Sequence, residues 1–213
     1  MRRTLKIKVC GMRDAANIGQ VAELKPDYLG LIFYPKSPRY VEDSLAPAIR
    51  QTIPDNTTLT GVFVNELLPE IIRKSNLFGF KWIQLHGNES PDYCMQLQEL
   101  GFTLIKAFGV NEQFNFKKLD SYQQACTYFL FDTRSEAHGG TGKKFDWMLL
   151  KQYSGEKPFF LSGGIEASDA QSILSLTLVN LFAIDINSRF EMEPGMKDIP
   201  KLRKFFKEIR THE

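Results

Sequence analysis

Two side chains that can exchange protons stand at the ends of predicted strands. Cys10 closes an alternating apolar run that begins at Leu5, and Asp132 follows the apolar residues 128–131. A thiolate can remove a proton and a carboxylic acid can donate one, so the two could act as general base and general acid if the fold placed them face to face. Each also has a plainer interpretation, because a cysteine after a strand is usually a small buried side chain and an aspartate there can cap a loop.

A pair of glycines predicts an anion site. Ser162-Gly163-Gly164-Ile165 lies between a predicted strand and a predicted helix. Glycine lets the backbone approach an anion closely, and the N–H groups at the start of a helix donate to it. After the last predicted strand, Asn187-Ser188-Arg189 could begin a further short helix. These positions favour phosphate over a simple turn, because in a parallel barrel the loops after strands seven and eight often hold a phosphate group.

Three other loop segments contain candidate site residues. Arg39 lies in a proline-stiffened loop, and its guanidinium suits a substrate carboxylate, although a solvated arginine is the alternative. His86 is either a site residue or a loop histidine. Residues Gly139–Lys143 look like a phosphate loop but lack the GxxxxGK(S/T) spacing, so we interpret them as a flexible lid over the substrate and not as a nucleotide site.

Short β-rich runs alternate with amphipathic helical runs along the whole chain. The predicted strands are Lys6–Cys10, Tyr28–Phe33, Leu59–Val64, Trp82–His86, Thr103–Phe108, Tyr128–Asp132, Phe159–Ser162 and Leu181–Ile186. The predicted helices are Asn17–Leu24, Asp43–Gln51, Leu68–Phe78, Pro91–Leu100, Asn115–Gln124, Asp146–Tyr153, Ala167–Leu174 and Ile199–Arg210. Repeats of about 27 residues favour a closed parallel (β/α)8 barrel, or TIM barrel, over an open sheet. We find no linker and expect a single domain over residues 1–213, with its active site at the C-terminal ends of the strands.

The composition argues against several other classes of protein. With 43% hydrophobic and 24% charged residues, the chain is typical of a soluble globular domain. The net charge of +2 gives no strong field for nucleic acid or an anionic membrane, and no apolar segment is long enough to span a bilayer. The three cysteines and three histidines show no metal-binding spacing, so we expect no metal, and reduced thiols in the cytoplasm. The partner we expect is a small phosphorylated substrate.

These motifs, taken in order, resemble one known family. The chain is similar along nearly its whole length to the phosphoribosylanthranilate isomerases of tryptophan biosynthesis. The matching segments are Lys8–Met12, Gly30–Val41, Gly61–Asn65, Gln84–Gly87, Gly139–Gly142, Phe145–Trp147, Ser162–Ile165, and Glu191 with Pro194, Gly195, Lys197 and Asp198. The resemblance implies a cofactor-free Amadori rearrangement, in which phosphoribosylanthranilate becomes carboxyphenylaminodeoxyribulose phosphate.

The resemblance also implies roles for individual residues. Asp132 would be the general acid that protonates the ribose ring oxygen and opens the ring to a Schiff base. Cys10 would be the general base that removes the C2 proton, giving an enolamine that becomes the ketone.

The implied binding residues come from three loops and one strand. Arg39 would hold the anthranilate carboxylate, and the backbone at Gly163-Gly164 and around Asn187-Ser188 would hold the phosphate. Asp185 matches the strand-eight aspartate of the family and would lie near the substrate's hydroxyls. Arg189 departs from the family, which commonly has a glycine there, and its charge could reach the phosphate.

Two alternatives stay open. The related histidine-pathway isomerase is a phosphosugar barrel too, but it typically uses two aspartates, and here Cys10 takes the first position. A catalytically silent phosphate-binding barrel would not need both Cys10 and Asp132. A monomer and a homodimer are both compatible with the sequence.

Overall fold

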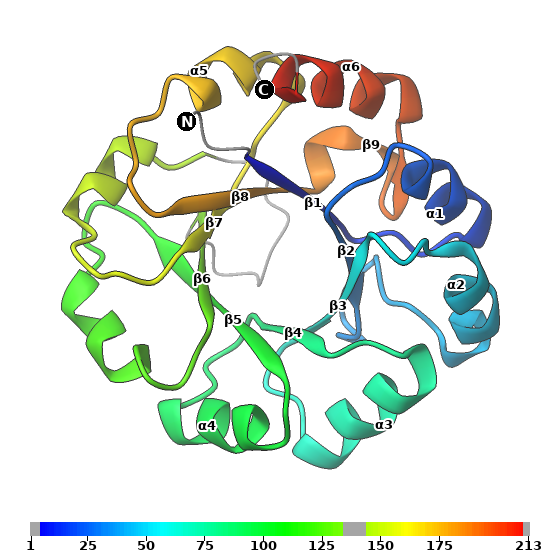
Figure 1. The fold of residues 1–213 in the computed structure, drawn as a ribbon, viewed down its shortest axis with the longest axis horizontal. Coiled ribbons are helices and arrows are strands. Elements are labelled where there is room, and N and C mark those ends of the chain that lie inside the picture. Colours follow the sequence, from blue (N-terminus) through cyan, green and yellow to red (C-terminus); the bar gives the residue numbers. More distant parts are fainter. Residues whose placement is uncertain (1–4, 134–143, 211–213) are drawn as a thin grey trace.

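Eight parallel strands close into a barrel in the order in which they occur along the chain, with helices outside them (Figure 1). The computed structural model describes residues 5–133 and 144–210. The strands are β1 (Lys6–Cys10), β2 (Tyr28–Ile32), β3 (Thr58–Phe63), β4 (Trp82–Leu85), β5 (Thr103–Val110), β6 (Tyr128–Thr133), β7 (Phe159–Leu161) and β8 (Leu181–Ile186). Because β1 pairs with both β2 and β8, the sheet has no free edge. This confirms the predicted TIM barrel.

The helices run antiparallel to the strands on the outside of the barrel, where they cover the outward apolar side chains. They are α1 (Ala15–Ala22), α2 (Ala46–Thr52), α3 (Leu68–Phe78), α4 (Pro91–Glu99), α5 (Ala170–Leu174) and α6 (Ile199–Arg210). The 3₁₀ helices η1 (Asp43–Leu45) and η4 (Ala167–Asp169) lead into α2 and α5.

Two predicted helices differ in type from the helices observed. Asn115–Gln124 and Asp146–Tyr153 contain only the 3₁₀ helices η2 (Phe116–Tyr122) and η3 (Trp147–Gln152). The reason is local, since Asn115 and Asp146 each accept a hydrogen bond from the backbone N–H two residues further on. Such a tight Asx contact competes with the hydrogen-bond pattern of an α-helix and suits the narrower 3₁₀ turn.

A small hairpin after β8 was not predicted. It consists of β9 (Glu191–Glu193) and β10 (Met196–Lys197), which pair antiparallel after the 3₁₀ helix η5 (Ser188–Phe190). Gly195 makes the turn with a φ of 91°, a conformation that favours glycine. The two strands are too short to give a clear alternating pattern, so the sequence gives little indication of them.

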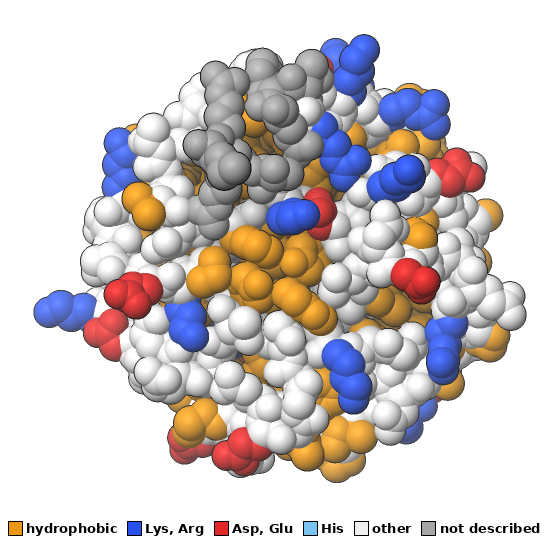
Figure 2. Space-filling view, viewed as in Figure 1, with side chains coloured by type: hydrophobic (Ala, Val, Ile, Leu, Met, Phe, Trp, Pro, Cys, Tyr) orange, Lys and Arg blue, Asp and Glu red, His pale blue; other side chains and the backbone are white. Residues whose placement is uncertain are grey.

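Aromatic side chains fill the N-terminal end of the barrel. Tyr28, Trp82 and Tyr128 are the first residues of their strands and pack around Phe160 and Phe182. The face shown in Figure 2 has hydrophobic side chains gathered at its centre, as such a plug requires. Because this end is closed by apolar packing, the polar side chains that point into the barrel lie nearer the opposite, C-terminal end.

The aromatic plug should be a large source of stability. Phe160 is fully buried, with its ring 5.4 Å from that of Tyr28 and 5.6 Å from that of Tyr128. We predict that Phe160→Ala lowers the free energy of unfolding by about 3–5 kcal/mol in denaturant titrations. Leu67→Ala is the control, because Leu67 is 72% exposed and should cost no more than about 0.5 kcal/mol. A loss below about 1 kcal/mol for Phe160→Ala would mean that the plug is loosely packed.

Candidate active site

A buried ion pair joins the first and last strands inside the barrel. Lys8 and Asp185 are register partners across β1 and β8, and Lys8 Nζ donates to Asp185 Oδ1 at 2.7 Å. The other carboxylate oxygen, Oδ2, accepts from Ser162 Oγ at 3.2 Å. Lys8 is fully buried and Asp185 is 5% exposed. Both carboxylate oxygens of Asp185 therefore have partners within the chain, and its place near the substrate's hydroxyls, which the resemblance implies, stays a prediction.

Cys10 lies on the same face of β1 as Lys8, two residues nearer the C-terminal end. Its register partner on β2 is Gly30, and a Cβ atom at that glycine would lie 2.6 Å from Cys10 Sγ and 3.1 Å from Lys8 Nζ. The missing side chain therefore makes room for both groups. Burial raises the pKa of the Cys10 thiol, and Asp185 adds to this, while Lys8 and Lys197 oppose it. The net direction is upward, so the thiolate is a minority form at neutral pH.

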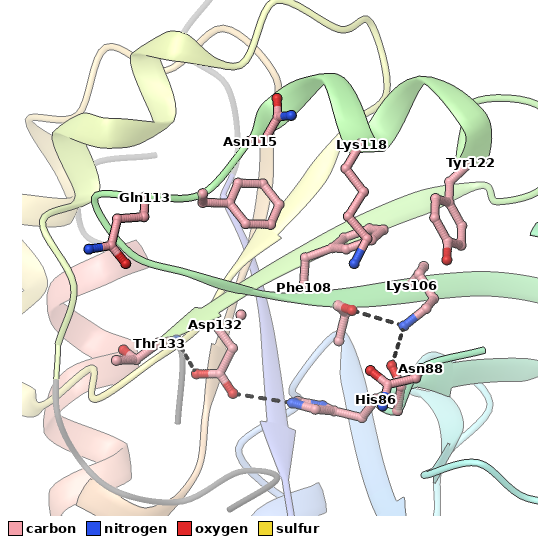
Figure 3. Close-up of a pocket in the computed structure, with 14 residues that line it drawn as sticks. His86, Asn88, Lys106, Phe108, Gln113, Asn115, Lys118, Tyr122, Asp132 and Thr133 are labelled. Atoms are coloured by element: carbon pink, nitrogen blue, oxygen red, sulfur yellow. Dashed lines mark hydrogen bonds and ion pairs between the residues drawn. The ribbon is translucent and has the colours of Figure 1, made fainter. Parts of the chain in front are cut away.

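Asp132 accepts a backbone N–H group and lies beside a histidine ring at the end of β6 (Figure 3). Its Oδ1 accepts from the backbone N–H of Thr133 at 2.7 Å, and its Oδ2 lies 3.3 Å from His86 Nε2. The Nδ1 atom of His86 lies 2.8 Å from Gln84 Nε2. With the amide oriented this way, Gln84 donates to Nδ1, which leaves the ring proton on Nε2, the nitrogen nearer Asp132. His86, for which the sequence left two interpretations open, is therefore a neighbour of the candidate acid.

A cavity of about 420 Å³ opens beside Asp132 and His86. The ends of β5 and β6, the loop after β4 and the segment that leads from β5 into η2 line it with aromatic rings, amides and cations, among them Phe108, Asn115 and Lys118 (Figure 3). The candidate acid therefore faces a space large enough for a small ligand, with polar groups around it.

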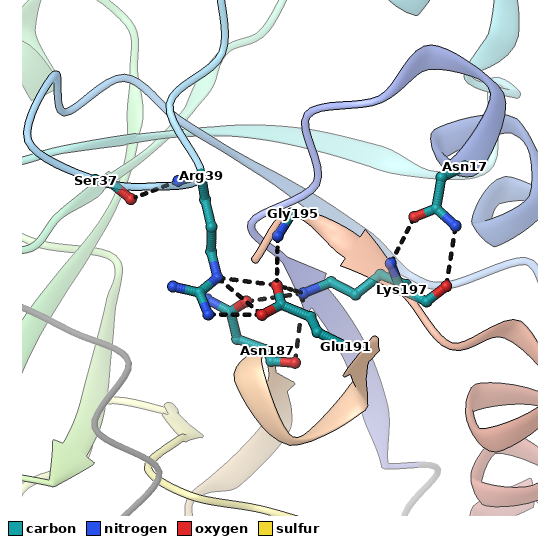
Figure 4. Close-up of polar contacts among 7 residues, drawn as sticks. All are labelled: Asn17, Ser37, Arg39, Asn187, Glu191, Gly195 and Lys197. Atoms are coloured by element: carbon teal, nitrogen blue, oxygen red, sulfur yellow. Dashed lines mark hydrogen bonds and ion pairs between the residues drawn. The ribbon is translucent and has the colours of Figure 1, made fainter. Parts of the chain in front are cut away.

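Arg39 takes part in a second network of charges, built around Glu191 (Figure 4). Its Nε and Nη2 atoms donate to the two carboxylate oxygens of Glu191 at 2.9 and 2.6 Å. Lys197 Nζ donates to Glu191 Oε1 at 2.7 Å and to Asn187 Oδ1 at 2.8 Å. The hairpin of β9 and β10 brings Glu191 and Lys197 together, and sequence reasoning gave neither residue a role.

Burial and charge oppose each other in this network. Burial raises the pKa of Glu191, but Arg39 and Lys197 together lower it below its usual value. Burial also lowers the pKa of Lys197, to about 8, although Glu191 acts in the other direction. Glu191 therefore stays ionised at neutral pH, and Lys197 begins to lose its charge under mildly alkaline conditions.

Gly11 lies between Cys10 and the charged network around Glu191. Its φ is 80°, and a Cβ atom there would lie 2.6 Å from Asn187 Oδ1 and 2.7 Å from Arg39 Cδ. Because Gly11 directly follows Cys10, Arg39 and Asn187 lie within one residue of the candidate base. The structure thus brings these predicted residues to the same part of the barrel mouth.

The predicted anion-binding glycines lie next to the candidate acid. Gly163 and Gly164 follow β7 with φ values of 91° and 66°, both in the left-handed region. A Cβ atom at Gly163 would lie 2.4 Å from Thr133 Oγ1 and 3.0 Å from Asp132 Oδ1, so a larger residue does not fit. Ser188 begins the short 3₁₀ helix η5, as the sequence suggested. The expected lid at residues 139–143 lies outside the described residues.

The described residues give no indication of a metal site or a membrane segment. Within residues 5–133 and 144–210, no three His, Cys, Asp or Glu side chains are grouped so that they could hold a metal ion. No helix in these two ranges is long and apolar enough to cross a membrane.

Comparison with known proteins places this geometry in a family. A model of the family described as N-(5'phosphoribosyl)anthranilate (PRA) isomerase matches residues 7–208. A relative from Parabacteroides distasonis, named N-(5'-phosphoribosyl)anthranilate isomerase, is 45% identical over 207 residues, which cover 95% of this chain and 92% of that protein.

Solved structures agree with this result. The phosphoribosyl anthranilate isomerase of Thermotoga maritima superimposes with a TM-score of 0.87 at 31% identity, covering 97% of this chain and 99% of that one. A second structure, of the enzyme in complex with reduced 1-(o-carboxyphenylamino)-1-deoxyribulose 5-phosphate, gives a TM-score of 0.84 at 29% identity, with 97% and 99% covered. Because both the family model and the relatives span almost the whole barrel, the chain belongs to the N-(5'-phosphoribosyl)anthranilate isomerase family.

Proposed function

We propose that this chain catalyses the Amadori rearrangement of N-(5'-phosphoribosyl)anthranilate in tryptophan biosynthesis, with Cys10 as general base and Asp132 as general acid. The observation that carries the proposal is that both residues lie at the C-terminal ends of their strands, β1 and β6, in a barrel that matches this family along its length. The cytoplasmic location of the protein and its oligomeric state, monomer or homodimer, stay predictions.

The reaction needs only proton transfers within one molecule. Asp132 donates a proton to the ribose ring oxygen, the bond from that oxygen to C1 breaks, and a Schiff base forms between C1 and the anthranilate nitrogen. The Cys10 thiolate removes the proton on C2, which gives an enolamine. A proton then adds to C1 while the C2 hydroxyl loses its own, and the ketone results. The reaction needs no electron acceptor and no second substrate, so an acid and a base at the barrel mouth are the only reactive groups that it requires.

The substrate's anionic groups require fixed partners. Arg39 would hold the anthranilate carboxylate, and its guanidinium has five N–H donors, so the contact with Glu191 leaves others for the substrate. The left-handed backbone at Gly163-Gly164, with the turn at Asn187-Ser188, would hold the phosphate. Binding both ends of the substrate would fix C2 and the ring oxygen between the base and the acid.

The direct test is turnover of freshly prepared phosphoribosylanthranilate, followed by the loss of its fluorescence. We expect turnover that survives exhaustive chelation, because no group of metal ligands occurs among the described residues. The phosphosugar substrate of the histidine pathway serves as the comparison. Turnover of that substrate alone, or activity that one metal restores after chelation, would contradict the proposal.

Replacing either proton-transfer group should abolish most turnover while leaving substrate binding intact. We predict that Cys10→Ala and Asp132→Asn each lower kcat by roughly 10²–10⁴-fold with little change in KM, since each loses a group that acts in the transition state. Cys94→Ala is the control, because Cys94 is also a buried cysteine but lies on α4, outside the barrel mouth. If Asp132→Asn kept its turnover, the acid would have to be another group, with Asp185 the first to test.

Arg39 should act mainly on binding. We predict that Arg39→Ala raises KM more than it lowers kcat, and that Arg39→Lys recovers only part of the loss because lysine lacks the planar fork. Arg73→Ala is the control, since Arg73 is an exposed arginine that also pairs with carboxylates. An unchanged KM for Arg39→Ala would remove Arg39 from the binding site.

A further inference from the structure

We propose that Lys8 is a positioning residue for the base, stabilising the Cys10 thiolate from within the barrel, and that Asp185 acts by holding Lys8 and not by contacting the substrate. The proposal rests on the proposed role of Cys10 as general base. It gives a function to a buried ion pair that the proton-transfer steps do not use.

The register of the barrel sets this geometry. On β1 the side chains alternate, so Lys8 and Cys10 share the inward face while Ile7 and Val9 pack outward. The Lys8 ammonium and the Cys10 sulfur lie within 3.1 Å and 2.6 Å of the point where a Gly30 Cβ would stand, so they are neighbours. Asp185 accepts a hydrogen bond from the same ammonium at 2.7 Å.

Lys8 remains a cation although it is fully buried. Burial lowers its pKa, but the charge of Asp185 and the hydrogen bond between them raise it, and the net pKa lies above the usual value for lysine. A lysine buried without such a partner would tend to lose its proton. Asp185 therefore keeps the group beside Cys10 positively charged at neutral pH.

The other charged groups around Cys10 are less suited to this task. Lys197 on β10 also favours the thiolate, but its effect on Cys10 is smaller than that of Lys8, and its pKa of about 8 means that its charge fades under alkaline conditions. Arg39 is paired with the same Glu191. Asp185 on β8 itself disfavours the thiolate, so its benefit to Cys10 comes through Lys8.

The test is the ionisation of Cys10 in the free enzyme, measured as the pH dependence of its alkylation by iodoacetamide and read from the Cys10 peptide by mass spectrometry. We expect Lys8→Met to move the midpoint to higher pH, with alkylation at neutral pH slowed about tenfold or more. Lys74→Met is the matched control, because Lys74 is also a buried lysine paired with a carboxylate, on α3. An unchanged midpoint in folded Lys8→Met would overturn the proposal.

Lys8→Met leaves the buried Asp185 carboxylate without its cationic partner and could impair folding, so the double variant Lys8→Met/Asp185→Asn removes both charges. Its midpoint should also lie above that of the wild type, because the effect of Lys8 on Cys10 is larger than that of Asp185. A midpoint at or below the wild-type value in the folded double variant would overturn the proposal as well.

Asp185→Asn separates the two roles for the carboxylate. If Asp185 acts through Lys8, the midpoint moves to higher pH, because a lysine buried without its carboxylate partner tends to lose its proton and then no longer stabilises the thiolate, and kcat falls while KM changes little. A raised KM with an unchanged alkylation profile would instead assign Asp185 to the substrate's hydroxyls. Because alkylation needs no substrate, it tests this inference even if Cys10→Ala keeps its turnover and the proposed function of Cys10 fails.

Discussion

A charge inside the barrel needs an opposite charge, and the pairing of β1 with β8 meets this need. Lys8 and Asp185 are register partners in the two strands that close the barrel, so their contact depends on correct closure. An unpaired charge at this depth would be strongly destabilising, because neither water nor another partner could replace the lost solvation. The same pair lies beside Cys10, so the barrel's closure and the electrostatic environment of the candidate base depend on one contact.

At the mouth of the barrel, a second buried carboxylate also pairs with cations from distant segments of the chain. Glu191 binds Arg39 from the loop after β2 and Lys197 from β10, and both contacts cross between segments far apart in the sequence. Gly11 lets this network lie directly beside Cys10. Arg39 is therefore already ordered by a protein carboxylate, so in its proposed role as carboxylate anchor the cost of ordering its long side chain falls on folding instead of on binding.

Much of the fold could be predicted from the sequence because it depends on local patterns. Strand bounds differ from those predicted by no more than two residues, since apolar runs with glycine or polar residues after them are local features. The 3₁₀ helices in place of two predicted helices depend on single Asx contacts, which hydrophobic periodicity does not detect. The hairpin after β8 has strands too short for any periodicity.

The candidate site was predictable only in part. Cys10, Asp132 and the glycine pair follow predicted strands, so the barrel itself brings them to one end. Partners such as Lys8 for Asp185 and Glu191 for Arg39 lie 177 and 152 positions apart, and only the closed sheet defines which of them meet. The sequence nevertheless indicates that Lys8 is buried. It lies two residues before Cys10 on β1, so both side chains point into the barrel, and a lysine at such a position requires a buried partner.

The central claim is that the Cys10 thiolate is the base, and its most direct test compares two titrations of the wild-type enzyme. One limb of the bell-shaped kcat/KM profile reports the essential base of the free enzyme, and alkylation of Cys10 reports its thiol ionisation independently. We predict that the midpoint of one limb coincides with the alkylation midpoint, above the ordinary range of a cysteine thiol because burial raises the pKa of Cys10. A profile in which neither limb has the alkylation midpoint would show that another group is the base.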